Sequence, residues 1–266
     1  MESINTVLVR YNEIGIKGKN RGYFERKLIE NIKDCLNKNN IKFNTIRRYS
    51  GRVLISTNNN CLCLKNVFGI SSFSPAIKSS LDIEEIKKLA LSLYTKGSFR
   101  VSAKRLNKKF KLTSEETNKL IGEVIIINKK AKVNLVKPDC NIAVEIMDQA
   151  YLFNERYECL GGLPVGVEGK VTLILDSKKS LLAGILMMKR GCSLEIIKET
   201  GIDYGILTQY CYGSNINIVK VPSKESKFII KVTSLEDMRS KIYNLPILNP
   251  LIADEKSLYQ NIWMPS

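Results

Sequence analysis

The spacing of apolar and polar residues predicts several short elements in the first 60 residues. A β-rich run at 6–10 is followed by a glycine-punctuated loop and by a helical pattern over 23–37, where apolar residues recur every three or four positions. Two short strands are expected near 41–46 and 52–56. One strand, one helix and two further strands predict a small α+β unit at the start of the chain.

A second set of elements follows up to residue 160. One helix should begin at Thr113, because Glu116 stands three residues later, which is the spacing of a capping box. The expected helices cover 61–68, 81–94 and 113–127, and the expected strands cover part of 68–77, then 98–103, 132–136, 141–146 and 150–156. Helices and strands mixed in this way favour a second α+β unit.

Residues 161–166, GGLPVG, form the clearest linker, because three glycines and a proline mark a boundary. Beyond it the pattern changes to strands at 171–175, 217–221 and 228–232 and helices at 180–189 and near 235–243 and 254–262. Alternation of this kind predicts a small open α/β sheet. The chain is therefore expected to contain three domains, over 1–60, 61–160 and 161–266.

The charge of the chain is strongly positive and unevenly distributed. Residues 1–160 contain 29 basic and 16 acidic residues, whereas residues 161–266 contain 13 and 10. A generally lysine-rich composition would give both parts a similar excess, so the difference favours a polyanion such as nucleic acid as the partner of the first part. The chain contains no histidine, which excludes Ser-His and Cys-His nucleophiles and histidine-ligated zinc.

The seven cysteines are scattered and are interpreted as reduced thiols that mostly fill the core. No metal site is expected. No apolar run reaches the roughly 18 residues of a membrane span, and the first residues do not resemble a signal peptide. These observations predict a cytoplasmic protein without a membrane partner.

Two basic loops are the candidates for contact with RNA phosphates, because side chains and backbone N–H groups can both reach phosphate oxygens there. Phe99 and Phe110 flank the second loop, where core packing is favoured over base stacking. The candidate residues of the first loop and its surroundings are Lys17, Lys19, Asn20, Arg21, Arg26, Arg47, Arg48 and Arg52, and those of the second loop are Lys104, Arg105, Lys108, Lys109 and Lys111.

Several stretches of the chain together resemble the tRNA 4-thiouridine synthetase (tRNA sulfurtransferase) family. They are RYNEIGIKGKNRGYFERKL (10–28), VFGISSFSPA (67–76), FRVSAKR (99–105), FKLTSEETN (110–118), GGLPVGVEGKV (161–171), LMMKRG (186–191) and NLPILNPLIADEKS (244–257). The resemblance implies a ferredoxin-like N-terminal domain, a THUMP domain and a truncated Rossmann-like PP-loop ATP-pyrophosphatase domain. In that family the first two domains present tRNA, bound near its acceptor end, to the third, which adenylates a uridine with ATP before a cysteine persulfide delivers sulfur.

The stretch that corresponds to the PP-loop departs from the family pattern S-G-G-[IF]-D-S. Residues 175–180 contain neither glycine, Lys179 occupies the aspartate position, and only Ser180 matches. The family's Cys-Arg pair and its later G-E-S-x-x-Q-V-A-S-Q-T stretch are also missing, while Cys192 and Cys211 remain conceivable sulfur carriers beside a core-filling role. The degenerate nucleotide loop consists of Asp176, Ser177, Lys178, Lys179 and Ser180.

These losses favour a protein that binds tRNA and assists a separate tRNA-modifying enzyme, with no catalytic residue and no cofactor of its own. A loop that holds phosphate or RNA backbone at the helix N-terminus is a second interpretation. Further alternatives are an active ATP-dependent tRNA sulfurtransferase with a divergent nucleotide site, sulfur delivery to thiazole synthesis, and a scaffold for a protein partner. A homodimer is left open, and ATP is expected only if the divergent loop functions.

Overall fold

The computed structural model of the 266-residue chain describes residues 4–49, 51–232 and 245–251. The helices expected near 235–243 and 254–262 lie outside the described residues. The chain divides into two compact units. The first unit contains the described residues within 1–10, 40–62 and 72–158, and the second contains those within 11–39, 63–71 and 159–266.

The first unit is built on an eight-stranded sheet with the order β2-β3-β1-β4-β7-β6-β5, in which β8 also pairs with β4. Only the pair β5–β6 is parallel among the described strand pairs of this sheet. The strands are β1 (Thr6–Arg10), β2 (Thr45–Tyr49), β3 (Arg52–Ser56), β4 (Ser72–Ser79), β5 (Phe99–Arg105), β6 (Cys140–Ile146), β7 (Ala150–Phe153) and β8 (Tyr157–Glu158).

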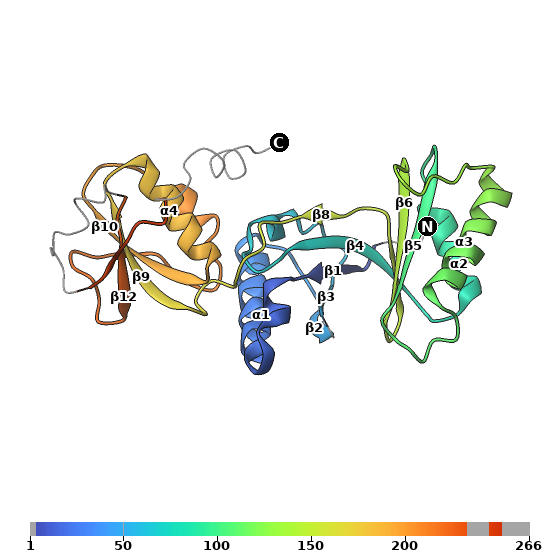
Figure 1. Cartoon of the computed structure of the whole chain (residues 1–266), viewed down its shortest axis with the longest axis horizontal. Helices are drawn as coiled ribbons and strands as arrows, with labels where there is room; N and C mark the ends of the chain where they lie inside the picture. The colour runs from blue at the N-terminus through green and yellow to red at the C-terminus, as the bar shows by residue number, and fades with distance from the viewer. Residues whose placement is uncertain (1–3, 50, 233–244, 252–266) are drawn as a thin grey trace. The chain divides into compact units, whose positions relative to one another are not determined.

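Two helices, α2 (Ile83–Leu93) and α3 (Ser114–Lys129), cover one face of β5, β6 and β7 (Figure 1). The alternate apolar residues of the strands, such as Val101 and Val144, point into this core. The helix starts follow from their caps. Asp82 accepts a hydrogen bond from the N–H of Glu84 (3.1 Å), and the expected capping box of Thr113 and Glu116 is present.

The second unit contains a five-stranded parallel sheet with the order β11-β10-β9-β12-β13. In chain order this arrangement is 3-2-1-4-5, so the strand order reverses between β9 and β12, as in doubly wound nucleotide-binding folds. The elements are β9 (Gly169–Leu175), α4 (Lys178–Lys189), β10 (Cys192–Lys198), α5 (Gly205–Thr208), β11 (Asn217–Ile218), β12 (Ser226–Ile230) and β13 (Ile247–Leu248).

Helix α1 (Arg21–Lys38) belongs to the second unit, together with the 3-10 turns η1 (Glu13–Ile16) and η2 (Gly18–Asn20). Its polar side chains bind backbone groups of that unit. Lys27 Nζ and Asn31 Nδ2 donate to the carbonyl oxygens of Gly213 and Val165, both at 3.1 Å, and Asp34 Oδ2 accepts from the N–H of Gly213 at 2.7 Å. The helix expected over 23–37 is therefore hydrogen-bonded to the linker at 161–166 and to the loop before β11.

Some predicted elements differ from the structure. The strand expected near 41–46 begins only at Thr45, and the helix expected over 61–68 is the 3-10 helix η3 (Leu62–Asn66). The segment 132–136 forms a single bridge at Val133 rather than a strand, because the Asn134 amide folds the chain into a turn by donating to the Lys137 carbonyl oxygen (2.8 Å). Side-chain hydrogen bonds of asparagine compete in this way with strand pairing.

Strand β10 was not predicted from the sequence, although it pairs with β9 along seven residues. Five of the seven residues of its sequence, CSLEIIK, are buried, and they lie on both faces, as in a buried parallel strand. Gly191, with φ +95°, connects it to the end of α4, and a Cβ there would lie 2.6 Å from Val167. A glycine directly after a helix is the signal that predicts a new element at this point.

Candidate nucleic-acid interface

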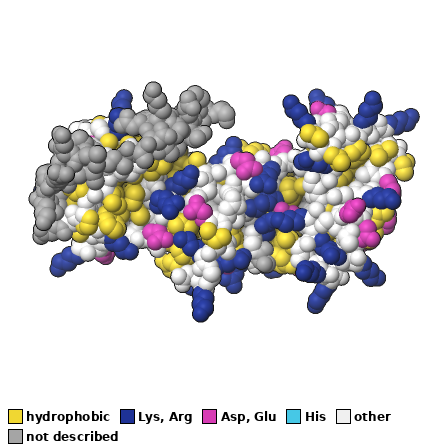
Figure 2. Space-filling view, in the orientation of Figure 1, with side chains coloured by type: hydrophobic (Ala, Val, Ile, Leu, Met, Phe, Trp, Pro, Cys, Tyr) yellow, Lys and Arg dark blue, Asp and Glu magenta, His cyan; other side chains and the backbone are white. Residues whose placement is uncertain are grey.

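One face of the eight-stranded sheet, opposite the face that α2 and α3 cover, carries most of its charged side chains. Strand register establishes this face, because directly paired residues point to the same side. Arg10 pairs with Arg52, and Lys104 pairs with Glu145. The basic residues at these positions and after β7 are Arg10, Arg47, Arg52, Lys78, Arg100, Lys104 and Arg156, and we call this surface the basic sheet face. Figure 2 shows Lys and Arg side chains gathered over β1 and β4.

Aromatic and aliphatic side chains form the floor between these charges. Leu8, Leu54, Tyr151 and Phe153 belong to one buried cluster, and Tyr49 packs against it while remaining half-buried. Cations above an apolar floor can hold phosphates, and the half-buried ring of Tyr49 can accept a stacked base, whereas Tyr151 and Phe153 are buried. The composition of the face therefore fits RNA better than it fits a purely ionic ligand.

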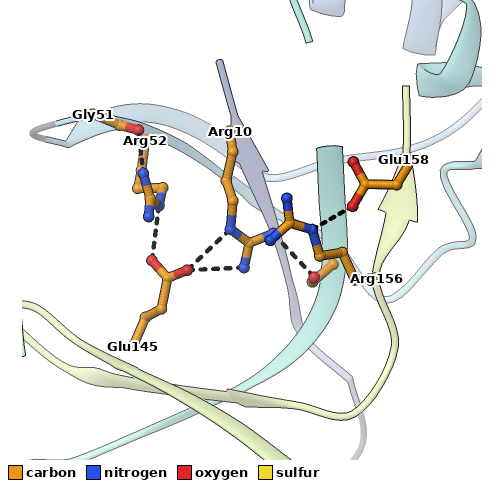
Figure 3. A network of polar contacts seen from close by, with 7 residues as sticks. Arg10, Gly51, Arg52, Glu145, Arg156 and Glu158 are labelled. Atoms are coloured by element: carbon orange, nitrogen blue, oxygen red, sulfur yellow. Dashed lines mark hydrogen bonds and ion pairs between the residues drawn. The ribbon is translucent and has the colours of Figure 1, made fainter. Parts of the chain in front are cut away.

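A buried network of ion pairs fixes the centre of the face (Figure 3). Glu145 Oε1 accepts from Arg10 Nε at 3.0 Å and lies 2.9 Å from Arg10 Nη2, while Glu145 Oε2 accepts from Arg52 Nε at 2.7 Å. Arg10 Nη1 also donates to Ser74 Oγ at 3.1 Å, and its guanidinium lies 4.8 Å from the centre of the Phe153 ring. The Arg10–Glu145–Arg52 network thus joins side chains from five strands, β1, β3, β4, β6 and β7.

The electrostatics of this network follow from its burial. Burial alone would raise the pKa of Glu145, but hydrogen bonds and positive charge from Arg52 and Arg10 outweigh that effect and lower it. Burial lowers the pKa of Arg10 from its usual value, against the opposing effect of Glu145. One carboxylate therefore balances two guanidinium groups, and the network keeps a net positive charge.

A cavity of about 410 Å³ opens on the face beside this network. Four cations line it, Arg10, Arg100, Lys104 and Arg156, against the two carboxylates of Glu145 and Glu155. Arg100 is held in place by Asn141 Oδ1 (3.0 Å from Nε) and by the Leu135 carbonyl oxygen (3.0 Å from Nη1). Arg156 is bonded to Glu158 at 2.7 Å, yet its side chain is 54% exposed. Positive charge around a concave surface suits a phosphate group.

The structure separates the predicted RNA-binding residues into groups. Arg47, Arg52 and Lys104 lie on the basic sheet face. Arg48 borders a smaller cavity on that face, but it pairs with Val53, so its side chain points to the opposite side of the sheet. Arg105 points to the other side of β5, where its Nη1 donates to the carbonyl oxygen of Phe110 (3.3 Å). Three further candidates, Lys108, Lys109 and Lys111, are exposed on the loop after β5. The remaining candidates, in the second unit, are Lys17, Lys19, Asn20, Arg21 and Arg26.

In the first basic loop, part of the charge is used inside the protein. Arg21 Nε donates to Glu25 at 2.8 Å and its Nη2 donates to Tyr11 Oη at 3.0 Å, while Tyr11 and Glu25 are themselves hydrogen-bonded. Lys17 lies over the Phe24 ring and 3.7 Å from Glu168. Lys19 is exposed. Arg21 therefore has a structural role at the start of α1.

Sequence reasoning missed Arg10, Lys78, Arg100 and Arg156. The signal for Arg100 and Lys104 is present in FRVSAKR, where apolar residues alternate with polar ones as expected for a half-buried strand. Phe99 and Phe110 are both buried, in agreement with the favoured core interpretation.

The degenerate nucleotide loop joins β9 to α4 beside the point where the strand order reverses. Ser180 is fully buried, and its hydroxyl donates to Asp176 Oδ1 (2.6 Å) and accepts from the N–H of Ser177 (3.3 Å). The N–H of Ser180 donates to the Ser177 carbonyl oxygen at 3.1 Å. The backbone N–H groups of Ser177 and Ser180, which a phosphate would need as donors, are therefore already hydrogen-bonded inside the loop.

The two cysteines considered as sulfur carriers are both buried. Burial raises the pKa of Cys192, and it raises the pKa of Cys211 to about 11. A thiol in such surroundings is a poor nucleophile, because the thiolate is the reactive form. All seven cysteines are free thiols. Within the described ranges, no cluster of three or more Cys, Asp or Glu residues is suited to a metal ion, and no helix is long and apolar enough to cross a membrane.

Comparison with known proteins gives matches along most of the chain. A family model described as "ThiI ferredoxin-like domain" matches residues 6–74, and one described as "THUMP domain" matches residues 81–155. A "Probable tRNA sulfurtransferase" of Thermococcus kodakarensis is 34% identical over 91% of this chain and 67% of its own length. One of Mycoplasmopsis synoviae is 37% identical over 80% of this chain and 60% of its own length. The chain thus spans between half and two thirds of the length of such relatives.

Two solved structures resemble this one. PH1313 from Pyrococcus horikoshii has a TM-score of 0.86 and 31% identity, with 97% of this chain and 98% of that chain covered. A 4-thiouridine synthetase in complex with RNA and bound ATP has a TM-score of 0.79 and 26% identity, with 98% and 84% covered. The ferredoxin-like and THUMP domains and the α/β C-terminal sheet predicted from the sequence are confirmed.

Proposed function

The chain belongs to the tRNA sulfurtransferase family, and we propose that it binds tRNA through the basic sheet face and assists tRNA modification without adenylating the RNA itself. The observation that supports this proposal best is the concentration of fixed cations around the 410 Å³ cavity. A similar structure, the 4-thiouridine synthetase, was solved with RNA. The acceptor end of tRNA is the region proposed to lie on this face.

Arg100 is held by two acceptors, so the position of its guanidinium group is set before RNA arrives, whereas the Arg10 and Arg52 side chains are only 7% and 12% exposed and add positive potential rather than direct phosphate contacts. Preorganised cations lose little side-chain entropy when a phosphate binds. Neutralisation of about six phosphates would give a log–log salt slope of roughly −4 to −5.

The absence of adenylation is proposed because the loop after β9 contains no glycine and because Ser177 and Ser180 bond to each other. Consecutive backbone N–H groups cannot converge on a pyrophosphate without residues that adopt positive φ. Under this proposal a separate tRNA-modifying enzyme supplies the chemistry, and the chain needs no cofactor.

An active ATP-dependent sulfurtransferase is the second candidate. The parallel sheet with its reversal of strand order beside Asp176 favours it, since nucleotides bind at such points in doubly wound folds. The similar 4-thiouridine synthetase structure also contains ATP. This candidate requires a nucleotide to bind without the glycines of the loop.

Titration of the full chain with a tRNA, at several salt concentrations, tests the RNA part of the proposal. Replacement of Arg100 by Gln should weaken binding and reduce the magnitude of the salt slope by about 1, because one phosphate contact is lost. Arg190→Gln is the matched control, because Arg190 is an exposed arginine of the second unit whose nearest acidic partner lies 3.8 Å away. Equal binding by both variants would refute the assignment of the basic sheet face.

Calorimetric titration with ATP, in the absence and presence of tRNA, tests the second part. No heat of ATP binding in either case is the expected result. Binding of ATP followed by tRNA-dependent release of pyrophosphate would replace the proposal with the active enzyme.

A further inference from the structure

Two cysteines that are distant in the sequence meet inside the second unit. Cys35 is part of α1 and Cys63 is part of η3, and both belong to that unit. Leu28, Ile32 and Cys35 recur at helical spacing, so they lie on one face of α1 and are buried together. The thiols of Cys35 and Cys63 are hydrogen-bonded to each other. The periodicity of α1 and the 3-10 turn of η3 thus bring two nucleophilic groups into contact.

The two thiols differ in their access to solvent. Cys35 is fully buried, whereas Cys63 is half-buried. Among the seven cysteines, all of which lie in the described part of the chain, only Cys63 and Cys159 are not buried. A small oxidant dissolved in water therefore reaches Cys63 before it reaches Cys35.

Polar groups surround the buried member of the pair. The Tyr212 hydroxyl is hydrogen-bonded to Cys35. Asn39 Nδ2 donates to the Cys35 carbonyl oxygen at 2.8 Å and lies 3.9 Å from the Cys35 sulfur. The Lys38 ammonium lies 5.9 Å from the centre of the Tyr212 ring. A cysteine that only filled the core would pack among apolar groups, whereas this sulfur has polar neighbours in addition to the second thiol.

The contact between the thiols divides their roles. The hydrogen bond from Cys35 lowers the pKa of Cys63 against the effect of burial, and the backbone N–H groups of Cys63 and Leu64 contribute in the same direction. The same hydrogen bond, together with burial, raises the pKa of Cys35. Cys63 is therefore the thiol that ionises first, and Cys35 remains protonated beside it. A reachable thiolate next to a second thiol is the arrangement of redox-sensitive cysteine pairs.

We propose that Cys35 and Cys63 form a redox-active pair that a hydroperoxide oxidises to a disulfide. The Cys63 thiolate attacks one peroxide oxygen, so that an S–O bond forms, the O–O bond breaks, and the other oxygen leaves as water or an alcohol after taking a proton from solvent. The Cys35 thiol then attacks the sulfur of the resulting sulfenic acid. The S–S bond forms, the S–O bond breaks, and the hydroxide leaves as water with the proton of Cys35. The two cysteines lose two electrons, which reduce the peroxide.

This disulfide would join α1 to η3 and close the chain between residues 35 and 63, a loop that contains β2 and β3. A cross-link restricts the unfolded chain much more than the folded one. The oxidised protein should therefore unfold at a temperature about 5–10 °C higher than the reduced protein. The inference goes beyond the proposed function, because neither the oxidation nor its measurement involves RNA.

The test treats the full, reduced chain with hydrogen peroxide, alkylates the remaining thiols and identifies the peptides by mass spectrometry. A linked peptide that contains Cys35 and Cys63 should appear, and dithiothreitol should reverse its formation. The Cys63 thiol should disappear at least about 10-fold faster than the Cys159 thiol, because thiolate character and access both favour Cys63. Cys159→Ser is the matched control, since Cys159 is the other half-buried cysteine, and this variant should form the linked peptide at the wild-type rate.

Two variants separate the roles of the pair. In Cys35→Ser a sulfenic acid should accumulate at Cys63, where dimedone traps it, because the second thiol is missing. In Cys63→Ser, which changes only a half-buried side chain, Cys35 should stay reduced. Thermal unfolding shows whether each variant is folded, and Cys63→Ser with the wild type decides the question if Cys35→Ser does not fold. If peroxide produces no linked peptide in the wild type, or oxidises Cys63 no faster than Cys159, the pair only fills the core and the inference is overturned, while the proposed function is unaffected.

Discussion

Replacement of Glu145 by Gln is the most informative change in the first unit, because it alters charge and hydrogen bonding with almost no change in volume. The carboxylate accepts from Arg10 with one oxygen and from Arg52 with the other. Glutamine has one acceptor oxygen, and its NH₂ group would face an arginine donor at one of these two positions. Two guanidinium groups would then share a site with no negative charge between them.

The cost of this change can be estimated from burial. The side chains of Arg10 and Glu145 are each 7% exposed, and that of Arg52 is 12% exposed. Removal of one partner from a buried ion pair destabilises a protein by about 3–5 kcal/mol, since the remaining charge is left without compensation. For a protein of this size each kcal/mol lowers the unfolding temperature by about 2–4 °C. We therefore expect Glu145→Gln to lower it by roughly 10 °C.

Glu158→Gln is the matched control. Glu158 also pairs with an arginine, Arg156, at 2.7 Å, but these side chains are 70% and 54% exposed. Exposed pairs contribute about 0–1 kcal/mol, so this variant should unfold within about 3 °C of the wild type. The measurement is thermal unfolding followed by circular dichroism at one scan rate. Equal unfolding temperatures for the two variants would refute the claim that burial makes the Glu145 network strong.

Three further predictions follow from single sites. Gly213→Ala should lower the free energy of unfolding of the second unit by about 3 kcal/mol, because its Cβ would lie 1.7 Å from Asn31 Oδ1 and the backbone has φ +73°. Gly161→Ala, at φ +67° but with open space around it, should lower the free energy of unfolding by only about 1 kcal/mol, and Gly201→Ala should leave it almost unchanged. Chemical denaturation measures all three. Because the folded pKa of Glu145 is lowered, its stabilisation is fully present above the unfolded value of about 4.3 and is lost as pH falls through the folded pKa, so acid unfolding curves should be less steep in Glu145→Gln. Cys211, with a pKa raised to about 11, should react with iodoacetamide at pH 7.5 at least about 100-fold more slowly in native than in unfolded protein. Mass spectrometry of the labelled peptide measures the two rates. Rapid labelling of the native protein would contradict the burial of this thiol.

Local signals in the sequence predicted the elements that depend on a few neighbouring residues. Thr113 and Glu116 are three positions apart, and their capping box forms as expected. The periodic apolar residues of α1 are buried as predicted, including Leu28 and Ile32. In each case the interacting groups lie within one or two helical turns, so spacing alone determines the contact.

The candidate site was less predictable, because strand register creates it. Arg10 and Glu145 are 135 residues apart and meet only because β1, β4, β7 and β6 are neighbours in one sheet. A one-residue shift in any strand would turn its side chains to the other face. The predicted loops were chosen by charge density, which identifies exposed cations such as Lys108 but cannot identify cations that a sheet brings together from distant strands.

The two halves of the chain also differ in how much sequence change their sites can tolerate. On the basic sheet face, side chains such as those of Arg100 and Lys104 supply the positive charge, and the strands fix only the positions of their Cα atoms. Phosphate binding of this kind needs cations at suitable alternate positions. In the loop after β9, binding would depend on backbone N–H groups, which converge only when residues such as glycine adopt positive φ. Under the proposed function, the loop therefore lacks the cradle that the two glycines give the family's nucleotide loop, whereas the basic sheet face depends on no glycine. This difference is the physical reason to expect RNA binding and nucleotide binding to be separable in this protein.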